Sequence, residues 1–66
     1  MKATVNGESR ELPEGSTIAS LLESLGVARS GIAVAKNDRV VRRPDYENSP
    51  IEDGDNVEII KAVAGG

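Results

Sequence analysis

The sequence predicts an α+β fold, in which one main helix packs across one face of a mixed, mostly antiparallel sheet of about four to five strands. Two observations predict it. Only one stretch shows helical spacing of its apolar residues, and short β-prone runs bounded by turn residues occur before and after it. The chain has 66 residues, the size of one small domain, and we expect residues 1–66 to form it.

The chain opens with two β-prone runs around an Asn-Gly pair. We expect strands at residues 2–6 and 8–12, because Asn6-Gly7 is the strongest two-residue hairpin signal. Both central positions of a type I′ turn need a positive φ, which these two residue types accept. Pro13 has no N–H to donate to a strand ladder and therefore ends the second strand.

The helix is the clearest element. Its apolar residues follow the i, i+3, i+4, i+7 spacing of a single helical face: Ile18, Leu21, Leu22 and Leu25. Ser16 or Thr17 is expected to cap the start with a side-chain oxygen, and Gly26 stands where a left-handed C-cap belongs. The stripe lasts only about two turns, too short for a coiled coil, so it predicts a core-facing surface.

Three more short strands are expected after the helix. The run "IAVAK" at residues 32–36 is apolar on both faces, with Ile32 and Val34 on one and two alanines on the other, and the sequence does not decide which face is core. A turn at residues 37–38 leads to the returning strand "RVV". The segment "RRPDYENSP" is expected to be irregular, "EDGD" is a turn, and "NVEIIKAV" forms the last strand.

The predicted core follows from these elements. Its members are Val5, Leu12, Ile18, Leu21, Leu22, Leu25, Val57 and Ile59, with help from Val40. Because side chains alternate between the faces of a strand, Ile60 and Ala62 then lie on the open face of the sheet. We expect them to contact a partner protein, unless the loop around Tyr46 covers Ile60.

Composition excludes several classes of function. The chain contains no Cys and no His, so it lacks the usual Ser–His and Cys–His pairs of covalent catalysis and the usual ligands of a zinc site. Its formal net charge is −3 and Tyr46 is its single aromatic residue, which argues against nucleic-acid binding. No run is long enough to cross a membrane and no signal peptide opens the chain. With no disulfide we expect a cytoplasmic location.

Two pairs of charged residues can be interpreted either as ordinary surface or turn residues or as functional residues. Asp53 and Asp55 flank a glycine in a predicted tight turn, and they lack the spaced ligands of a calcium loop. We therefore expect the turn and no metal site. Arg42 and Arg43 form a small basic spot in an acidic chain, which is either a solvated loop or an ion-pairing contact with a partner.

The chain ends in "AVAGG", which invites a chemical interpretation. Glycine makes up about 7% of average proteins, so two terminal glycines arise by chance in roughly one chain in 200. Glycine has no Cβ, so such an end can thread a channel too narrow for side chains. We expect Ala64 and Gly65 to thread such a channel, and Gly66 to present its carboxylate. The segment is expected to be ordered through about Val63 and mobile at residues 64–66.

The whole chain resembles the ThiS-type sulfur-carrier family of thiamine biosynthesis, which has the ubiquitin-like β-grasp fold. The matching stretches are "VNGE", "EGSTIASLLESLG", "IAVAKNDRVVRR" and "IEDGDNVEIIKAVAGG", of which the last is the most specific. One departure is Lys36, where relatives usually carry Val or Ile, and it concerns a partner face rather than the fold.

The resemblance implies a protein cosubstrate and not an enzyme. A ubiquitin-activating-like (ThiF-type) adenylating enzyme would use ATP to attach AMP to the carboxylate of Gly66, and no cofactor would be bound by the carrier itself. A persulfide donor fed by a cysteine desulfurase would then leave a thiocarboxylate, and a ThiG-type thiazole synthase would accept the sulfur. The alternatives are a carrier for molybdopterin or tRNA thiolation, and a ubiquitin-like modifier conjugated to lysines through Gly66. The molybdopterin-synthase small subunits resemble the chain less, because they are longer and usually have Pro-Pro before the tail.

Overall fold

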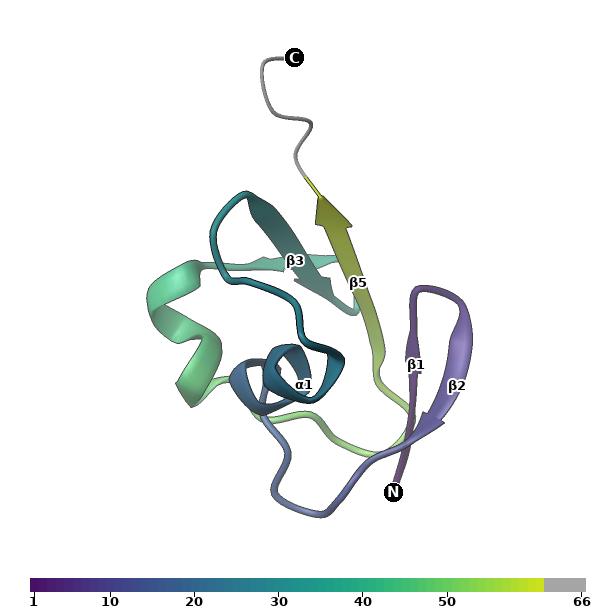
Figure 1. Ribbon diagram of the computed structural model, residues 1–66. Helices are drawn as coiled ribbons and strands as arrows, with labels where there is room; N and C mark the ends of the chain where they lie inside the picture. The colour runs from purple at the N-terminus through teal and green to yellow at the C-terminus, as the bar shows by residue number, and fades with distance from the viewer. Residues whose placement is uncertain (62–66) are drawn as a thin grey trace.

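The chain folds into a five-stranded mixed sheet with one α-helix across one face, as the computed structural model in Figure 1 shows. The structure describes residues 1–61. In chain order the elements are β1 (Lys2–Val5), β2 (Glu8–Glu11), α1 (Ile18–Leu25), β3 (Ile32–Lys36), β4 (Arg39–Val41), the 3-10 helix η1 (Arg43–Asn48) and β5 (Asn56–Lys61). The strands lie side by side in the order β2-β1-β5-β3-β4, so the last strand is the central one.

The β1–β2 hairpin forms as predicted. Asn6 and Gly7 have φ angles of 51° and 82°, the two positive values that a type I′ turn requires. The strands pair antiparallel from Val5 opposite Glu8 to Lys2 opposite Glu11, and each ends one residue earlier than expected. On its other side β1 runs parallel to β5, while β3 pairs antiparallel with both β5 and β4.

The helix spans the predicted residues and has both predicted caps. Thr17, not Ser16, is the N-cap: its hydroxyl accepts the N–H of Ser20, and the Ser20 hydroxyl accepts the N–H of Thr17. Ser16 instead donates its hydroxyl to the carbonyl of Pro13 at 2.7 Å. Gly26 has a φ of 69° and ends the helix in the left-handed conformation.

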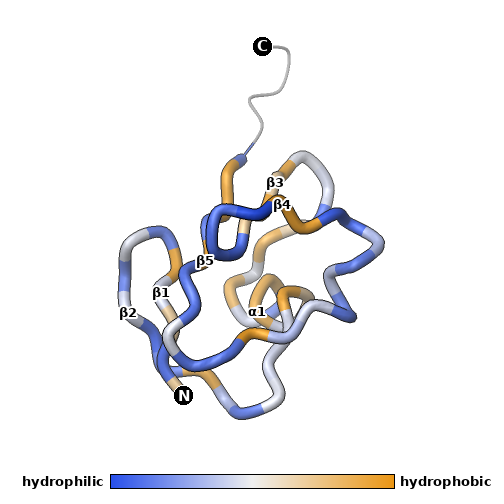
Figure 2. Tube along the Cα trace, turned by 180° about the vertical axis from the view of Figure 1, so that it is seen from behind, coloured by the Kyte–Doolittle hydropathy of each residue, from blue (hydrophilic) through white to orange (hydrophobic). Residues whose placement is uncertain are grey.

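The core lies between the helix and one face of the sheet. Its buried apolar residues are Ala3, Val5, Leu12, Ile18, Ala19, Leu21, Leu22, Val34, Tyr46, Ile51 and Val57. Leu25 and Ile59, both predicted as core, are only partly buried and pack against this cluster. In strand β3 the face that carries Val34 is the core face. Hydrophobic segments occur in α1, β3 and β5, whereas β2 is hydrophilic along its length (Figure 2).

The prediction that Val40 helps the core is wrong, because its side chain is 76% exposed. The register explains this. Val34, a core residue, pairs with Val41, and Ala35 pairs with Val40. Since neighbouring residues of a strand point to opposite faces, Val41 lies on the helix side and Val40 on the open side.

The segment around Tyr46 is not irregular as predicted. Residues 43–48 form η1, with Pro44 in its first turn, where a fixed φ and a missing N–H cost nothing. Tyr46 is 2% exposed, and η1 packs against α1. The single aromatic side chain of the protein therefore belongs to the core.

Candidate functional site at the base of the C-terminal segment

The central strand β5 leads directly into the segment that the sequence marks as functional. Ala62, Ala64, Gly65 and Gly66 lie outside the described residues, as does the expectation of where order ends near Val63. Within residues 1–61 the candidate site is therefore the end of β5 and the surfaces beside it.

Strand β5 is bonded on both sides along its first half. Towards β1, the carbonyl of Val57 accepts the N–H of Asn6 at 2.9 Å, and the carbonyl of Asp55 accepts the N–H of Thr4 at 2.9 Å. Towards β3, the carbonyl of Asn56 accepts the N–H of Asn37 at 2.7 Å. Odd-numbered residues of β5 thus present their backbone groups to β1, and even-numbered residues present theirs to β3.

Two asparagine side chains also form hydrogen bonds with the backbone of β5. The amide oxygen of Asn6 accepts the N–H of Ile59 at 2.7 Å, and that of Asn37 accepts the N–H of Asn56 at 2.9 Å. Both asparagines have a φ of 51°, in turns at opposite sides of the strand. Asn tolerates the left-handed conformation of such turns, and in both of them the side-chain oxygen is the acceptor for an N–H of β5. The sequence pattern marks both as turn residues but does not reveal this second role.

The two aspartates before β5 are used by the fold, as the predicted turn implies. Asp53 accepts the N–H of Lys2 at 2.7 Å, and Asp55 accepts the N–H of Glu52 at 2.8 Å and the side-chain amide of Asn37 at 3.0 Å. Burial raises the pKa of Asp55, but these two hydrogen bonds and the nearby Lys36 ammonium more than offset it and leave the pKa below its ordinary value. Among residues 1–61, no group of three or more acidic side chains is placed to hold a metal ion.

An apolar patch lies on the open face of the sheet beside the end of β5. Ile60 is 58% exposed, as predicted, so the alternative that the loop around Tyr46 covers it is wrong. Ala33 pairs with Ile60, and Ala35 with Val40, which places these four residues on one surface. We call them the open-face patch: Ala33, Ala35, Val40 and Ile60. A two-residue turn at positions 37–38 fixes the pairing of Ala35 with Val40. The exposure of Val40 could therefore have been predicted from the strand register.

Other charged residues of the prediction lie away from this patch or make local contacts. Lys36 is on the helix side of β3, like Val34, and donates its ammonium to the carbonyl of Pro50 at 2.7 Å. Lys36 therefore does not lie on the open face, and its expected effect on a partner face stays a prediction. Arg42 and Arg43 are exposed and form no ion pair with any residue in the range 1–61, so both interpretations of them remain open.

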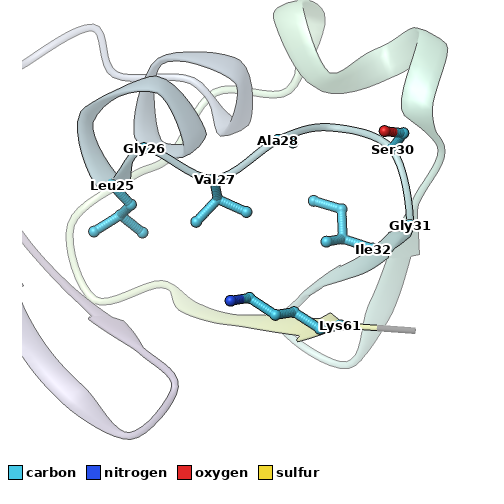
Figure 3. A pocket seen from close by; sticks show the side chains of 8 residues that line it. All are labelled: Leu25, Gly26, Val27, Ala28, Ser30, Gly31, Ile32 and Lys61. Carbon is cyan, nitrogen blue, oxygen red and sulfur yellow. The ribbon is translucent and has the colours of Figure 1, made fainter. Parts of the chain in front are cut away.

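A groove of about 410 Å³ lies on the helix side of the end of β5 (Figure 3). It is lined by Leu25, Val27, Ile32 and Lys61, together with small residues of the loop after α1. Lys61 follows Ile60 in the strand, so its side chain leaves from the other face of the sheet. The chain thus enters its last segment between an apolar patch on one side of the sheet and a groove of mixed polar and apolar lining on the other, an arrangement suited to contact with another protein.

A helix laid across a mixed five-stranded sheet, with the C-terminal strand in its centre, defines a ubiquitin-like β-grasp protein. The model of the ThiS family matches residues 3–66. The chain belongs to the ThiS family: it is a sulfur carrier for thiamine thiazole synthesis and serves as a cosubstrate, not as an enzyme.

Three similar proteins illustrate the match. The sulfur carrier protein ThiS of Thermus thermophilus is 39% identical over 62 residues, which cover 94% of this chain and 95% of that protein. A thiazole synthase of Paramagnetospirillum magneticum is 36% identical over all 66 residues, and the chain spans 20% of its length. The crystal structure of the thiamine biosynthesis protein ThiS from Geobacter metallireducens superposes with a TM-score of 0.86 at 32% identity, covering both chains completely.

Proposed function

We propose that the chain carries sulfur as a thiocarboxylate on Gly66. The observation that carries this proposal is the Gly-Gly pair at residues 65–66, inside the segment that the ThiS family model matches. A carboxylate is a poor electrophile, and coupling it to AMP gives a reactive mixed anhydride. The outer sulfur of a persulfide can then attack this anhydride and displace AMP, which gives an acyl disulfide with the donor. A second thiol would attack the donor sulfur, form a disulfide with it and release the thiocarboxylate. The chain has no Cys, so it has no thiol that could hold the sulfur in another way.

The adenylating step requires a partner that uses ATP, and we propose a ubiquitin-activating-like enzyme. Its contact surface is the open-face patch together with Ala62, because Ile60 and Val40 expose apolar side chains next to the strand that leads to Gly66. Ala64 and Gly65 would enter the narrow channel before the ATP site. ATP is thus a substrate of the partner, and the carrier needs no cofactor of its own.

The sulfur acceptor is proposed to be a thiazole synthase. A protein of that name from Paramagnetospirillum magneticum contains a stretch similar to this whole chain, which amounts to 20% of its length. A carrier-like stretch within the same polypeptide as the acceptor enzyme supports a direct contact between the two. None of the helices in residues 1–61 has the length and apolar character to cross a bilayer. We propose that these reactions occur in the cytoplasm, with a cysteine desulfurase as the source of the persulfide.

Deletion of Gly66 tests the attachment point. It shortens the reach of the chain by roughly 3.5 Å, while reacting atoms must approach within about 3–3.5 Å of each other. We expect ATP–pyrophosphate exchange by the adenylating enzyme to be abolished. Gly65→Val, which adds a β-branched side chain in the channel, should have the same effect. Ala64→Gly keeps the length, removes only a methyl group and should preserve exchange.

Two further readouts complete the test. The melting temperature of all three variants should stay close to that of the unaltered chain, because the core cluster of the described part of the chain is built from residues between Met1 and Ile59, which these changes leave intact. The mass of the protein from cells should show exchange of one oxygen for sulfur. Normal adenylation of the Gly66 deletion would overturn the proposal, and adducts to lysines of other proteins would identify a modifier instead.

A further inference from the structure

Strand β5 loses its β1 neighbour before it ends. β1 pairs with β5 only at Thr4 opposite Asn56 and Val5 opposite Val57, after which the chain turns at Asn6. Figure 1 shows the β1–β2 turn beside the middle of β5, and the far end of β5 with β3 on one side only. Beyond Val57, β5 has no neighbouring strand on this side, although it is the central strand of the sheet.

The hydrogen-bonding groups on this edge follow from the alternation along β5. Ile59 and Lys61, like Val57, direct their backbone groups away from β3. The N–H of Ile59 is taken by the side chain of Asn6. The carbonyl of Ile59 and the N–H of Lys61 have no hydrogen-bond partner within residues 1–61. We call this stretch, residues 59–61, the unpaired edge.

We propose that the unpaired edge pairs with an extended strand of the adenylating enzyme, which takes the place that β1 leaves beside β5. This inference rests on the proposed function, since it concerns the partner that receives Gly66. An edge with an unpaired donor and acceptor is a template for strand addition, in which main-chain hydrogen bonds supply affinity.

The geometry favours a strand parallel to β5. In a parallel pair, one residue donates its N–H to the carbonyl of one neighbour and accepts the N–H two residues further along. The carbonyl of Ile59 and the N–H of Lys61 have this spacing. An antiparallel residue exchanges both of its bonds with one opposite residue, so it cannot bond the carbonyl of Ile59 and the N–H of Lys61 together, and opposite Ile59 it would also need the N–H that Asn6 already holds.

The side chains beside the unpaired edge indicate which residue types the added strand should have. Ile60 lies on the open face and is 58% exposed, which suits an apolar neighbour. Lys61 lies on the helix side, is exposed, and forms no ion pair within residues 1–61, which suits an acidic neighbour. The added strand thus combines an apolar and an acidic residue on its two faces.

The charge beside the edge argues against a second copy of this chain as the occupant. The unpaired edge of a second copy would carry Lys61 and no acidic residue, so it does not supply the acidic neighbour that suits Lys61. For a partner that already encloses residues 62–66, two bonds are a useful addition. They fix the chain just before the segment that must reach the ATP, and so set its register in the channel.

The test uses the full chain made by chemical synthesis, with an ester in place of the amide between Ile60 and Lys61. The ester removes the N–H of Lys61 and keeps every side chain, and the all-amide synthetic chain is its matched control. We expect binding to the adenylating enzyme, measured by calorimetry, to weaken by about 2- to 12-fold, the range for one hydrogen bond. Melting curves of both chains verify that the fold is retained.

Amide hydrogen exchange on the unaltered chain supplies a second readout that needs no variant. The Lys61 amide should become protected in the complex, while the Glu58 and Ile60 amides, which face β3, should change little. Equal affinities of the two synthetic chains, together with an unprotected Lys61 amide in the complex, would overturn the inference. Protection that appears without enzyme and grows with carrier concentration would assign the edge to a second copy and overturn it too. If saturating enzyme adenylates both chains, the role of Gly66 stands whatever the result at Lys61.

Discussion

Leu22→Ala measures how much of the fold depends on the face of α1 that meets the sheet. The Leu22 side chain is 1% exposed. Truncation removes three carbons, worth about 2.4 kcal/mol in transfer free energy at roughly 0.8 kcal/mol each. The cavity left behind raises the loss to as much as about 5 kcal/mol. A domain of this size has a free energy of unfolding of about 3–10 kcal/mol in total, so we expect this variant to be largely unfolded at 37 °C or close to it.

Thermal unfolding followed by circular dichroism checks this expectation. At about 4–8 °C per kcal/mol for a domain of this size, the melting temperature should fall by at least about 10 °C. Val40→Ala is the control, because Val40 is 76% exposed and its truncation should change the free energy of unfolding by less than about 0.5 kcal/mol. A Leu22→Ala protein that melts within about 2 °C of the unaltered chain would refute the reasoning.

Two other substitutions address the turn before β5 and the open face. The pKa of Asp55 is lowered in the folded state, so its ionised form stabilises the fold above the unfolded pKa of about 3.9, and this contribution is lost as the pH falls through the folded pKa. Asp55→Asn should therefore lose less stability than the unaltered chain between about pH 7 and pH 3 in urea titrations; an equal loss would contradict this assignment. Ile60→Asp should keep the melting temperature and weaken binding to the adenylating enzyme, and unchanged affinity by calorimetry would remove Ile60 from the proposed interface.

Local patterns in the sequence were enough to predict the hairpin and the helix. The Asn6-Gly7 turn and the Thr17 and Gly26 caps each depend on residues a few positions apart. The interactions that form them can therefore be inferred from the local sequence. The exposure of Ile60 followed from alternation along one strand. The Gly-Gly end and the resemblance in "IEDGDNVEIIKAVAGG" led to the family, which the family model and the solved relative confirm.

The errors arose where distant segments decide the outcome. Tyr46 stands between two prolines in a polar run, and its burial accompanies the packing of η1 against α1, which the local sequence does not reveal. Val40 and Val41 look alike in the sequence, and the pairing with β3 alone determines which of them faces the helix. The parallel pairing of β1 with β5 joins the first and last strands, and it is this pairing that brings Asn6 to the N–H of Ile59.

The central place of β5 has a mechanical consequence. If a partner holds the C-terminal segment as proposed, a pull on that segment reaches the fold through β5, whose last described residue is Lys61. The bonds to β1 on one side and β3 on the other run across the axis of this strand, so they are loaded together, in shear. A strand at the edge of the sheet, pulled sideways, would instead lose its bonds one at a time. We therefore expect the fold to resist unfolding when a partner binds the C-terminal segment and later releases it.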